Sequence, residues 1–310
     1  MSDSELNTQY SESRNGNFRL RGMGVAMVTP FREDLTIDVE ALDRLVEHIV
    51  TGGADFIVVL GTTAETPTLS PEERDFVARR VVEKTAGRLP LVLGVGGNCT
   101  RSVCDELSSR DLSGYSAILS VVPFYNKPTQ EGIFRHYCAI AEASPVPVIL
   151  YNVPGRTGRN MTAETTLRLA QIPNIIGVKE ASGDLDQIYE IVERKPEGFE
   201  VISGDDAITI PLMRRGVSGV ISVAGNAYPR EMAAMVHAAA NDDFRTARSL
   251  DRDLSDIYRL LFADGNPGGI KAMLASMGMM QEVLRLPLVP VGDEVRRELA
   301  AAAEAFADRS

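Results

Sequence analysis

One lysine in this sequence stands where an amine could do covalent chemistry. Lys179 ends the apolar segment IIGVK at residues 175–179, and the polar segment EASGD follows at 180–184. A short apolar run bounded by turn residues is typical of a buried strand. A lysine at the end of such a strand is partly dehydrated, which favours the neutral amine. Because that amine attacks carbonyl carbons, Lys179 is a candidate for Schiff-base formation.

The alternation of a β-strand predicts which neighbours share a face with Lys179. Side chains two residues apart point the same way, so Ile175 and Gly177 are expected beside the lysine, and Ile176 and Val178 on the opposite face. Gly177 has no side chain and is expected to leave an empty slot below the lysine. Burial against this slot and the surrounding wall is the expected means of keeping the amine neutral.

Hydroxyl and guanidinium groups follow other apolar runs in the same way. Tyr151 ends the run before Lys179, and Thr62 follows an earlier one, so a tyrosine backed by a threonine hydroxyl could carry protons without a histidine. Arg156 lies in a loop rich in proline and glycine and offers a planar fork that suits a carboxylate. Each residue also has a plainer interpretation, since a lone lysine usually forms a salt bridge and a lone tyrosine usually packs. Catalysis is favoured only because all of these residues follow apolar runs and are expected to meet at the same end of the fold.

No metal site is expected from the histidines and cysteines. His48, His136 and His237 all fall within expected helices, and the three cysteines have no metal-ligand spacing. Cys99 lies near the expected mouth without a general base, and its role is taken to be structural. We therefore expect neither a metal nor another cofactor.

Eight apolar, β-branched segments alternate with amphipathic ones along the chain. Strands are expected near residues 24–29, 55–60, 91–95, 117–122, 147–151, 175–179, 200–203 and 218–223. Helix starts are marked by Asp38, by Thr162 and by the capping box that Ser70 begins. Eight alternating units predict an α/β fold, a (β/α)8 TIM barrel with its chemistry at the carboxyl ends of the strands. An open doubly wound sheet is the alternative, but it requires a glycine-rich turn that the first strand lacks.

The remaining segments set the expected domain limits. Residues 1–17 are polar and are expected to form a flexible arm, residues 18–240 the barrel, and residues 241–310 a small helical domain with helices at 241–263, 268–281 and 291–307. The net charge of −11 argues against a nucleic-acid partner, and no apolar run is long enough for a membrane span. Without an export signal, a cytoplasmic location with reduced thiols is expected.

Six motifs together resemble those of the dihydrodipicolinate synthase family, which belongs to the pyruvate-dependent class I aldolases together with N-acetylneuraminate lyases. The resemblance extends from about Gly22 to the end of the chain. The motifs are GTTAE at 61–65, PFYNKPTQEG at 123–132, YNVPGRTG at 151–158, GVKEASGD at 177–184, SGDD at 203–206 and GVISV at 219–223.

This resemblance implies a reaction and a role for each matching residue. It implies condensation of pyruvate with L-aspartate 4-semialdehyde to 4-hydroxy-tetrahydrodipicolinate, a lyase reaction of diaminopimelate and lysine biosynthesis, in a homotetramer built as a dimer of dimers. Lys179 would form the Schiff base and Tyr151 would exchange protons. The other implied site residues are Thr62 and Tyr125 in a hydroxyl relay, with Tyr125 supplied by a neighbouring subunit, Thr63 and Ile221 at pyruvate, Arg156 at the aldehyde carboxylate, and Gly204.

The chain departs from the family pattern in two places. Ala64 replaces a more usual glycine and should be tolerated unless its backbone needs a positive φ. Lysine-inhibited members line a pocket with histidine, glutamate and tyrosine, whereas the matching positions here are Pro71, Arg74, Ser102 and Phe124. Asn98 of that pocket remains. Without an acid to receive the amino group of lysine, we expect weak or absent lysine inhibition.

Two other functions remain open from the sequence. One is a different pyruvate aldolase, such as an N-acetylneuraminate or keto-deoxy-sugar lyase, against which Arg156 and the YNKP segment at 125–128 argue. The other is a barrel without activity that serves as a binding protein. The presence of both Lys179 and Tyr151 argues against that second function.

Overall fold

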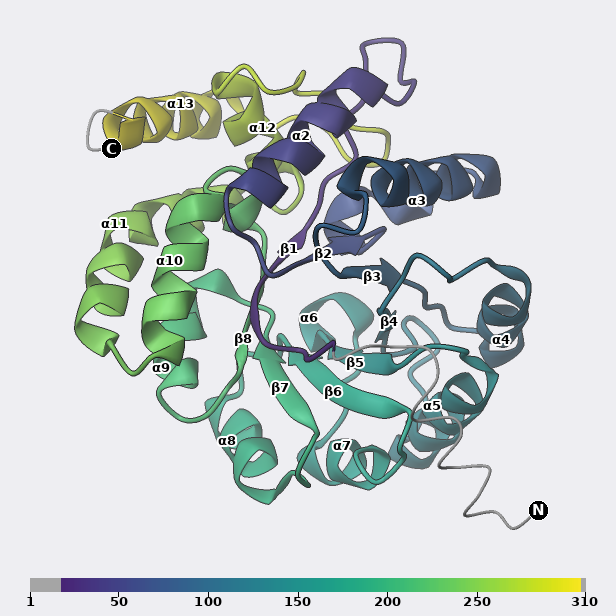
Figure 1. The fold of residues 1–310 in the computed structure, drawn as a ribbon. Helices are drawn as coiled ribbons and strands as arrows, with labels where there is room; N and C mark the ends of the chain where they lie inside the picture. The colour runs from purple at the N-terminus through teal and green to yellow at the C-terminus, as the bar shows by residue number, and fades with distance from the viewer. Residues whose placement is uncertain (1–17, 308–310) are drawn as a thin grey trace.

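Eight parallel strands form a closed barrel in the computed structural model, which describes residues 18–307. Each strand pairs with the next along the chain, and the last pairs with the first (Figure 1). The predicted TIM barrel is thereby confirmed. The strands are β1 Gly22–Ala26, β2 Phe56–Val59, β3 Leu91–Gly94, β4 Ala117–Val121, β5 Val148–Asn152, β6 Ile175–Glu180, β7 Glu200–Ser203 and β8 Gly219–Ser222.

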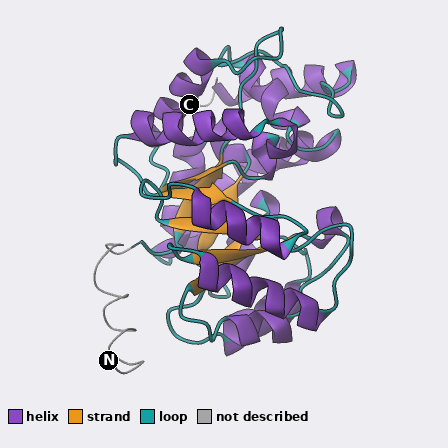
Figure 2. Ribbon diagram, turned by 90° about the vertical axis from the view of Figure 1, so that its right-hand side faces the viewer, coloured by secondary structure: helices purple, strands orange, loops and turns teal. Residues whose placement is uncertain are grey.

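Helices surround the barrel and form its outer layer, as the two ribbon views show (Figures 1 and 2). They carry the apolar faces that bury the outside of the strands. The helices that follow β1 to β8 are α2 Val39–Thr51, α3 Pro71–Thr85, α4 Thr100–Ser109, α5 Gln130–Ala143, α6 Pro154–Thr157, α7 Ala163–Leu169, α8 Leu185–Arg194, α9 Thr209–Met213 and α10 Pro229–Ala240.

The predicted helix starts are confirmed by their hydrogen bonds. Asp38 and Thr162 accept backbone N–H bonds at the first turns of α2 and α7. Ser70 and Glu73 form a reciprocal capping box at α3, with the Ser70 N–H donating to Glu73 Oε2 at 2.9 Å. These caps satisfy backbone donors that a helix start leaves without partners.

Side chains from the strands divide between two apolar clusters. The inner cluster fills the barrel and includes Val58, Leu119 and Ile202. The outer cluster lies between the barrel and its helices and includes Val25, Leu93 and Val201. This division follows from the alternation of side chains along each strand, so the strands are buried on both faces.

The predicted faces of β6 are partly wrong, because the strand contains an irregularity. The pairing with β5 shifts register after Val148, whose partner is Ile175, to Ile149, whose partner is Gly177. Ile175 therefore packs in the outer cluster and Ile176 against the inner one, the reverse of the prediction. One extra residue in a strand changes the faces of the residues before it. Val178 lies outside, as predicted.

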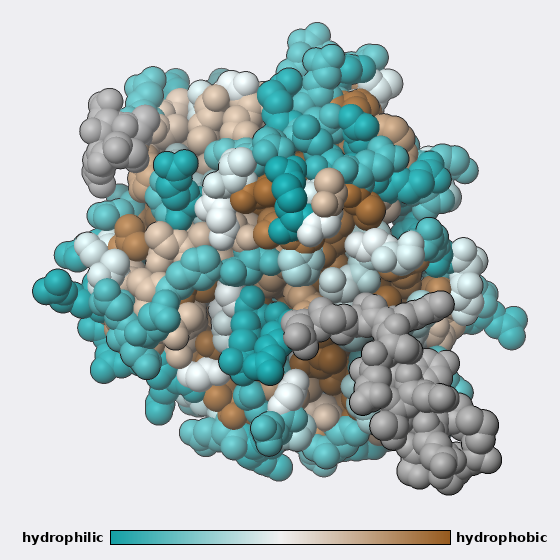
Figure 3. All heavy atoms as spheres, viewed as in Figure 1, coloured by the Kyte–Doolittle hydropathy of each residue, from teal (hydrophilic) through white to brown (hydrophobic). Residues whose placement is uncertain are grey.

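Leu20 fills the space that was expected to be empty beside Gly177. A side chain at Gly177 would meet Leu20 Cδ2 at 2.7 Å and the Glu200 carbonyl oxygen at 2.5 Å. Leu20 is buried in the inner cluster, and the Phe18 ring lies edge-on to Phe56 with centroids 5.7 Å apart. The segment before β1 thus closes the amino end of the barrel. Figure 3 shows the surface of the molecule in the view of Figure 1, where hydrophilic residues lie along much of its outline.

Three helices follow the barrel, and no strand follows β8 within residues 18–307. They are α11 Phe244–Ala263, α12 Gly268–Ser276 and α13 Asp293–Ala307. Each is shorter than predicted, and α11 begins late because Asp243 caps it through the Thr246 N–H. In Figure 1, α12 and α13 lie together above the barrel near α2. None of the helices in this described part is long and apolar enough to cross a membrane. The predicted arm at 1–17 lies outside the described residues.

Candidate active site

A cavity of about 840 Å³ opens at the carboxyl ends of the strands. It is the place where a barrel of this type carries its chemistry. Six of the eight predicted site residues line it: Thr62, Thr63, Tyr151, Arg156, Lys179 and Gly204. The side chains come from separate segments of the chain, so closure of the barrel is what brings them together.

Lys179 and Tyr151 are direct neighbours on β6 and β5. Their Cα atoms are paired across the sheet, and Lys179 Nζ lies 4.5 Å from the centre of the Tyr151 ring. The lysine is only 6% exposed. Its Nζ is thus held over an aromatic face at the bottom of the cavity, within reach of a small ligand. The pairing places a phenol beside an amine, as a proton carrier for Schiff-base chemistry requires.

Gly204 gives the lysine side chain room to enter the cavity. A Cβ atom at this position would lie 2.9 Å from Lys179 Cε and 2.8 Å from Ala181 Cβ. Contacts that close force a shift of the neighbouring atoms. Gly204 therefore contributes by having no side chain. From the sequence alone, a glycine at this position indicates a turn and not this requirement for space.

Thr62 and Thr63 lie in a short 3-10 turn, Thr62–Ala64, that begins just after β2. Asn266 Nδ2 donates to Thr63 Oγ1 at 3.1 Å. The next residue, Glu65, has a φ of 56° and ends the turn in the left-handed conformation. Ala64 is not among the residues with positive φ, so its backbone makes no demand for glycine. This removes the structural objection to an alanine at that position.

Arg156 reaches the cavity from α6, directly after β5. Its Nη2 donates to the Asn266 carbonyl oxygen at 3.1 Å, which leaves further guanidinium donors for an anionic ligand. Asn266 thus touches both Arg156 and Thr63 from the segment between α11 and α12. The C-terminal helices reach into the site, and neither charge pattern nor spacing in the sequence indicated this contact.

Two predicted residues do not line this cavity. Ile221 is buried among the inner side chains of the barrel. Tyr125 is 86% exposed, with a φ of 72°, in the loop after β4. Its N–H donates to the Thr157 carbonyl oxygen at 3.3 Å, so the backbone is tied to α6 while the phenol faces outwards. Both roles stay predictions.

Family comparison gives the same interpretation as the geometry. The model of the dihydrodipicolinate synthetase family matches residues 19–306, nearly all of the described chain. The chain belongs to this family. A relative from Parabacteroides distasonis named 4-hydroxy-tetrahydrodipicolinate synthase is 57% identical over 275 residues, 88% of this chain and 93% of the relative.

Two solved members of the dihydrodipicolinate synthetase family have the same fold. The enzyme from Thermotoga maritima is 36% identical, with a TM-score of 0.91 over 94% of this chain and 99% of its own. A chloride-inhibited enzyme from Acinetobacter baumannii, complexed with pyruvate, is 38% identical, with a TM-score of 0.90 over 93% and 99% of the two chains. The predicted family and fold are confirmed.

A polar network lies directly behind Lys179 and Tyr151. Glu180 follows Lys179 and Asn152 follows Tyr151, and Asn152 Nδ2 donates to Glu180 Oε1 at 2.7 Å. Burial raises the pKa of Glu180, and hydrogen bonds from Ser182 and Asn152 oppose this rise. The sequence placed Glu180 in a turn. Its burial could have been foreseen only from the continued pairing of β6 beyond the lysine.

A buried ion pair is a third feature that was not predicted from the sequence, after the Asn266 contacts and the Glu180 network. Lys271 on α12 pairs with Glu65, and both side chains are 0% exposed. Burial lowers the pKa of Lys271 to about 8, and the charge of Glu65 opposes that shift. The signal was present, since Lys271 stands alone within the apolar stretch GGIKAMLA.

The histidines lie in α2, α5 and α10, within helices as predicted. Within residues 18–307, no group of three or more histidine, cysteine or acidic side chains is placed to hold a metal ion.

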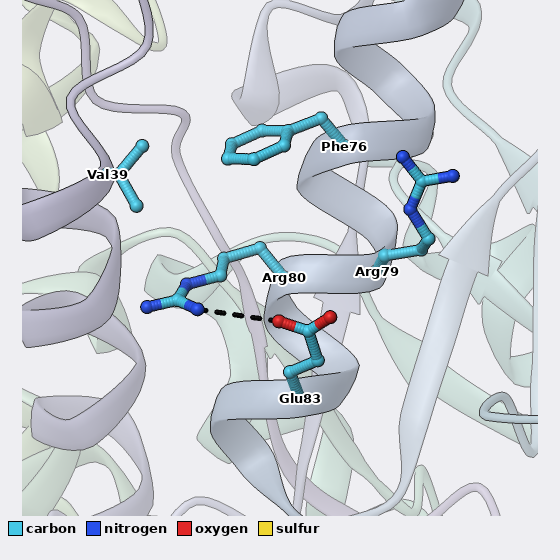
Figure 4. A pocket seen from close by; sticks show the side chains of 5 residues that line it. All are labelled: Val39, Phe76, Arg79, Arg80 and Glu83. Carbon is cyan, nitrogen blue, oxygen red and sulfur yellow. Dashed lines mark hydrogen bonds and ion pairs between the residues drawn. The ribbon is translucent and has the colours of Figure 1, made fainter.

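A second, smaller hollow lies between α2 and α3 (Figure 4). Its volume is about 230 Å³, and Arg80 in its wall contacts Glu83 at 3.4 Å and Asp43 at 2.8 Å. None of the predicted site residues lines it. Because the charge of Arg80 is already paired, we assign the chemistry to the larger cavity.

Proposed function

We propose that this chain condenses pyruvate with L-aspartate 4-semialdehyde to 4-hydroxy-tetrahydrodipicolinate, a step of diaminopimelate and lysine biosynthesis. The observation that supports this most directly is the pairing of Lys179 with Tyr151 at the bottom of the cavity. The relative from Parabacteroides distasonis carries the corresponding name at 57% identity. A lysine beside a phenol at the carboxyl ends of barrel strands suits imine chemistry.

The reaction begins with the neutral amine of Lys179. It attacks the ketone carbon of pyruvate, and loss of one water leaves an iminium that draws electrons from the methyl carbon. Removal of a methyl proton gives an enamine, whose carbon attacks the aldehyde carbon of the second substrate. The amino group of that substrate then closes the ring onto the former ketone carbon and releases Lys179. One water is lost overall.

Neighbouring side chains take the remaining roles. Tyr151 passes protons to and from the reacting atoms, with Thr62 and Tyr125 as the relay. Thr63 and Ile221 contact pyruvate through their backbones, with Gly204 beside them. Arg156 binds the carboxylate of the aldehyde with donors that Asn266 leaves free. We propose that no metal or other cofactor takes part, because the imine itself supplies the electron sink.

A second subunit completes the site in this proposal. Tyr125 faces outwards from its own chain and lies outside its own cavity, which suits a residue that enters a neighbour. We propose a homotetramer built as a dimer of dimers, acting in the cytoplasm. The chain itself is acidic, so an anionic substrate depends on the local charge of Arg156.

We also propose that lysine inhibits this enzyme weakly or not at all. Arg74 and Phe124, two of the positions that match the lysine pocket of inhibited members, line the cavity. An arginine repels the amino group of a lysine effector, and Ser102 offers no charge to receive it. An inhibition constant in the low millimolar range or below would contradict this.

Covalent trapping tests the proposed function. Incubation with pyruvate and borohydride should reduce the imine and leave a stable adduct on Lys179, detected by peptide mass spectrometry. A Lys179→Ala variant is the control and should give none. A panel of aldehydes that includes L-aspartate 4-semialdehyde and N-acetylmannosamine then identifies the second substrate. Turnover of the sugar alone would replace the proposed synthase by a sugar-acid lyase.

A further inference from the structure

The buried ion pair joins the threonine turn of the barrel to the C-terminal helices. Glu65 follows the turn Thr62–Ala64, and Lys271 lies on α12. Both side chains are fully buried, and Lys271 Nζ pairs with Glu65 Oε1. The pair is therefore a fixed contact between two parts of the chain that are distant in sequence.

Three segments hold the ammonium of Lys271 in one place. Besides Glu65, Lys271 Nζ donates to the Val283 carbonyl oxygen at 2.9 Å. It also lies 4.1 Å from the centre of the Phe31 ring, which follows β1. A buried charge with several partners of fixed geometry has little freedom to move. The ammonium does not itself line the cavity.

The Glu65 carboxylate connects the fixed Lys271 ammonium to the turn Thr62–Ala64. Glu65 Oε2 accepts the Arg285 N–H at 3.1 Å, so both carboxylate oxygens are engaged. The backbone N–H of Glu65 donates to the Thr62 carbonyl oxygen at 3.2 Å, and its φ of 56° is costly for a residue other than glycine. A strained conformation persists only where its surroundings impose it. The side-chain contacts of Glu65 supply that constraint next to Thr62.

We propose that the Glu65–Lys271 pair is a positioning device that holds Thr62 and Thr63 at the cavity wall, and that α12 is thereby part of the reaction apparatus. This rests on the proposed function, in which Thr62 belongs to the proton relay. Stability alone is a weak explanation for such a pair, because desolvation of two buried charges offsets much of their attraction. Glu65 and Lys271 act through Thr62, not on the substrate.

A neutral double variant, Glu65→Gln with Lys271→Met, tests the proposal without leaving a buried charge unpaired. The matched control is Met273→Ala, which truncates a fully buried side chain of the same helix away from the pair. For each protein, kcat and the KM for pyruvate are measured together with the thermal unfolding midpoint. Borohydride trapping with pyruvate follows in parallel.

The double variant should lose about 10- to 100-fold in kcat, as a misplaced catalytic group does, with a smaller rise in the KM for pyruvate, which Thr63 contacts in the proposed function. It should still form the Lys179 adduct, and Met273→Ala should keep its kcat despite a lower midpoint. Wild-type kcat in the double variant would overturn the proposal, as would an equal loss in Met273→Ala. No adduct in the wild-type protein would overturn the proposed function, and this inference with it.

Discussion

Single residues set the chemistry, and Tyr151 is the clearest case. Its ring lies beneath Lys179 Nζ, and the two residues are fixed by strand pairing, not by loops. Removal of the phenol hydroxyl should leave this packing intact while it removes the group that we propose as the proton carrier. General acid–base groups contribute roughly 10²- to 10⁴-fold to rates.

We therefore expect Tyr151→Phe to lower kcat by about 10²-fold or more, with a smaller change in the KM for pyruvate. Steady-state kinetics gives this split, and circular dichroism checks the fold. Covalent trapping at Lys179 should slow but persist, because the amine remains. Full activity in the variant would remove Tyr151 from the mechanism.

Buried His136 is a second single residue with a testable effect, in this case on the pH dependence of the stability of the fold. Burial lowers the pKa of His136 to about 4, whereas an unfolded histidine titrates near 6.5. Between these values the unfolded chain binds a proton that the folded chain does not, so stability falls as pH falls from about 6.5 to 4. The loss from this residue is roughly 3 kcal/mol at most.

A His136→Gln variant should therefore show a shallower loss of stability over that range. Urea unfolding at several pH values measures it, with wild-type protein as the reference. Parallel curves for the two proteins would show that His136 does not control acid stability.

The strands and helices set the positions of these residues. At the ends of β6 and β7, a single added carbon atom would be enough to displace Lys179. Gly204 follows β7, and its missing side chain is what admits Lys179 to the cavity. A Gly204→Ala variant should lower kcat by about 10- to 100-fold, because its Cβ would displace the amine. Gly155→Ala is the matched control, since a Cβ there meets nothing within 4 Å. Equal kinetics in the two variants would contradict this account.

The strands themselves were predictable from the sequence to within a few residues, because apolar runs and helix caps repeat eight times. The sides of the sheet to which Ile175 and Ile176 point were not predictable. One irregular residue in β6 reverses these sides, and nothing in the amino-acid composition indicates it. The site was predictable where residues follow strands, as Lys179, Tyr151 and Thr62 do. Asn266 and Lys271 reach it from helices that follow the barrel, and local patterns carry no information on such long-range contacts.

At the scale of the whole molecule, the exposed Tyr125 makes the proposed site depend on more than one chain. Mixed oligomers test this. Tyr125→Phe and Lys179→Ala subunits should each be nearly inactive alone, since one lacks the relay it would lend and the other lacks the amine. After dissociation and random mixing in equal amounts, half of the dimers pair one subunit of each kind, and each should regain one complete site.

Activity should then recover to about a quarter of the wild-type value. Recovery is measured against the unmixed variants treated in the same way. An absence of recovery, with mixed dimers confirmed by native mass spectrometry, would mean that Tyr125 does not act in a neighbour.

Leu20 and Phe18 pack at the amino end of the barrel, whereas the cavity opens at the carboxyl ends of the strands. Lys179 lies at the bottom of this cavity, so in the proposed reaction both substrates approach its amine from the carboxyl side of the barrel. In the proposed reaction the imine of pyruvate forms first, because the enamine that attacks the aldehyde is made from it. Binding of the two substrates in turn thus follows from the covalent chemistry, and the closed amino end sets the side of the barrel from which each one arrives.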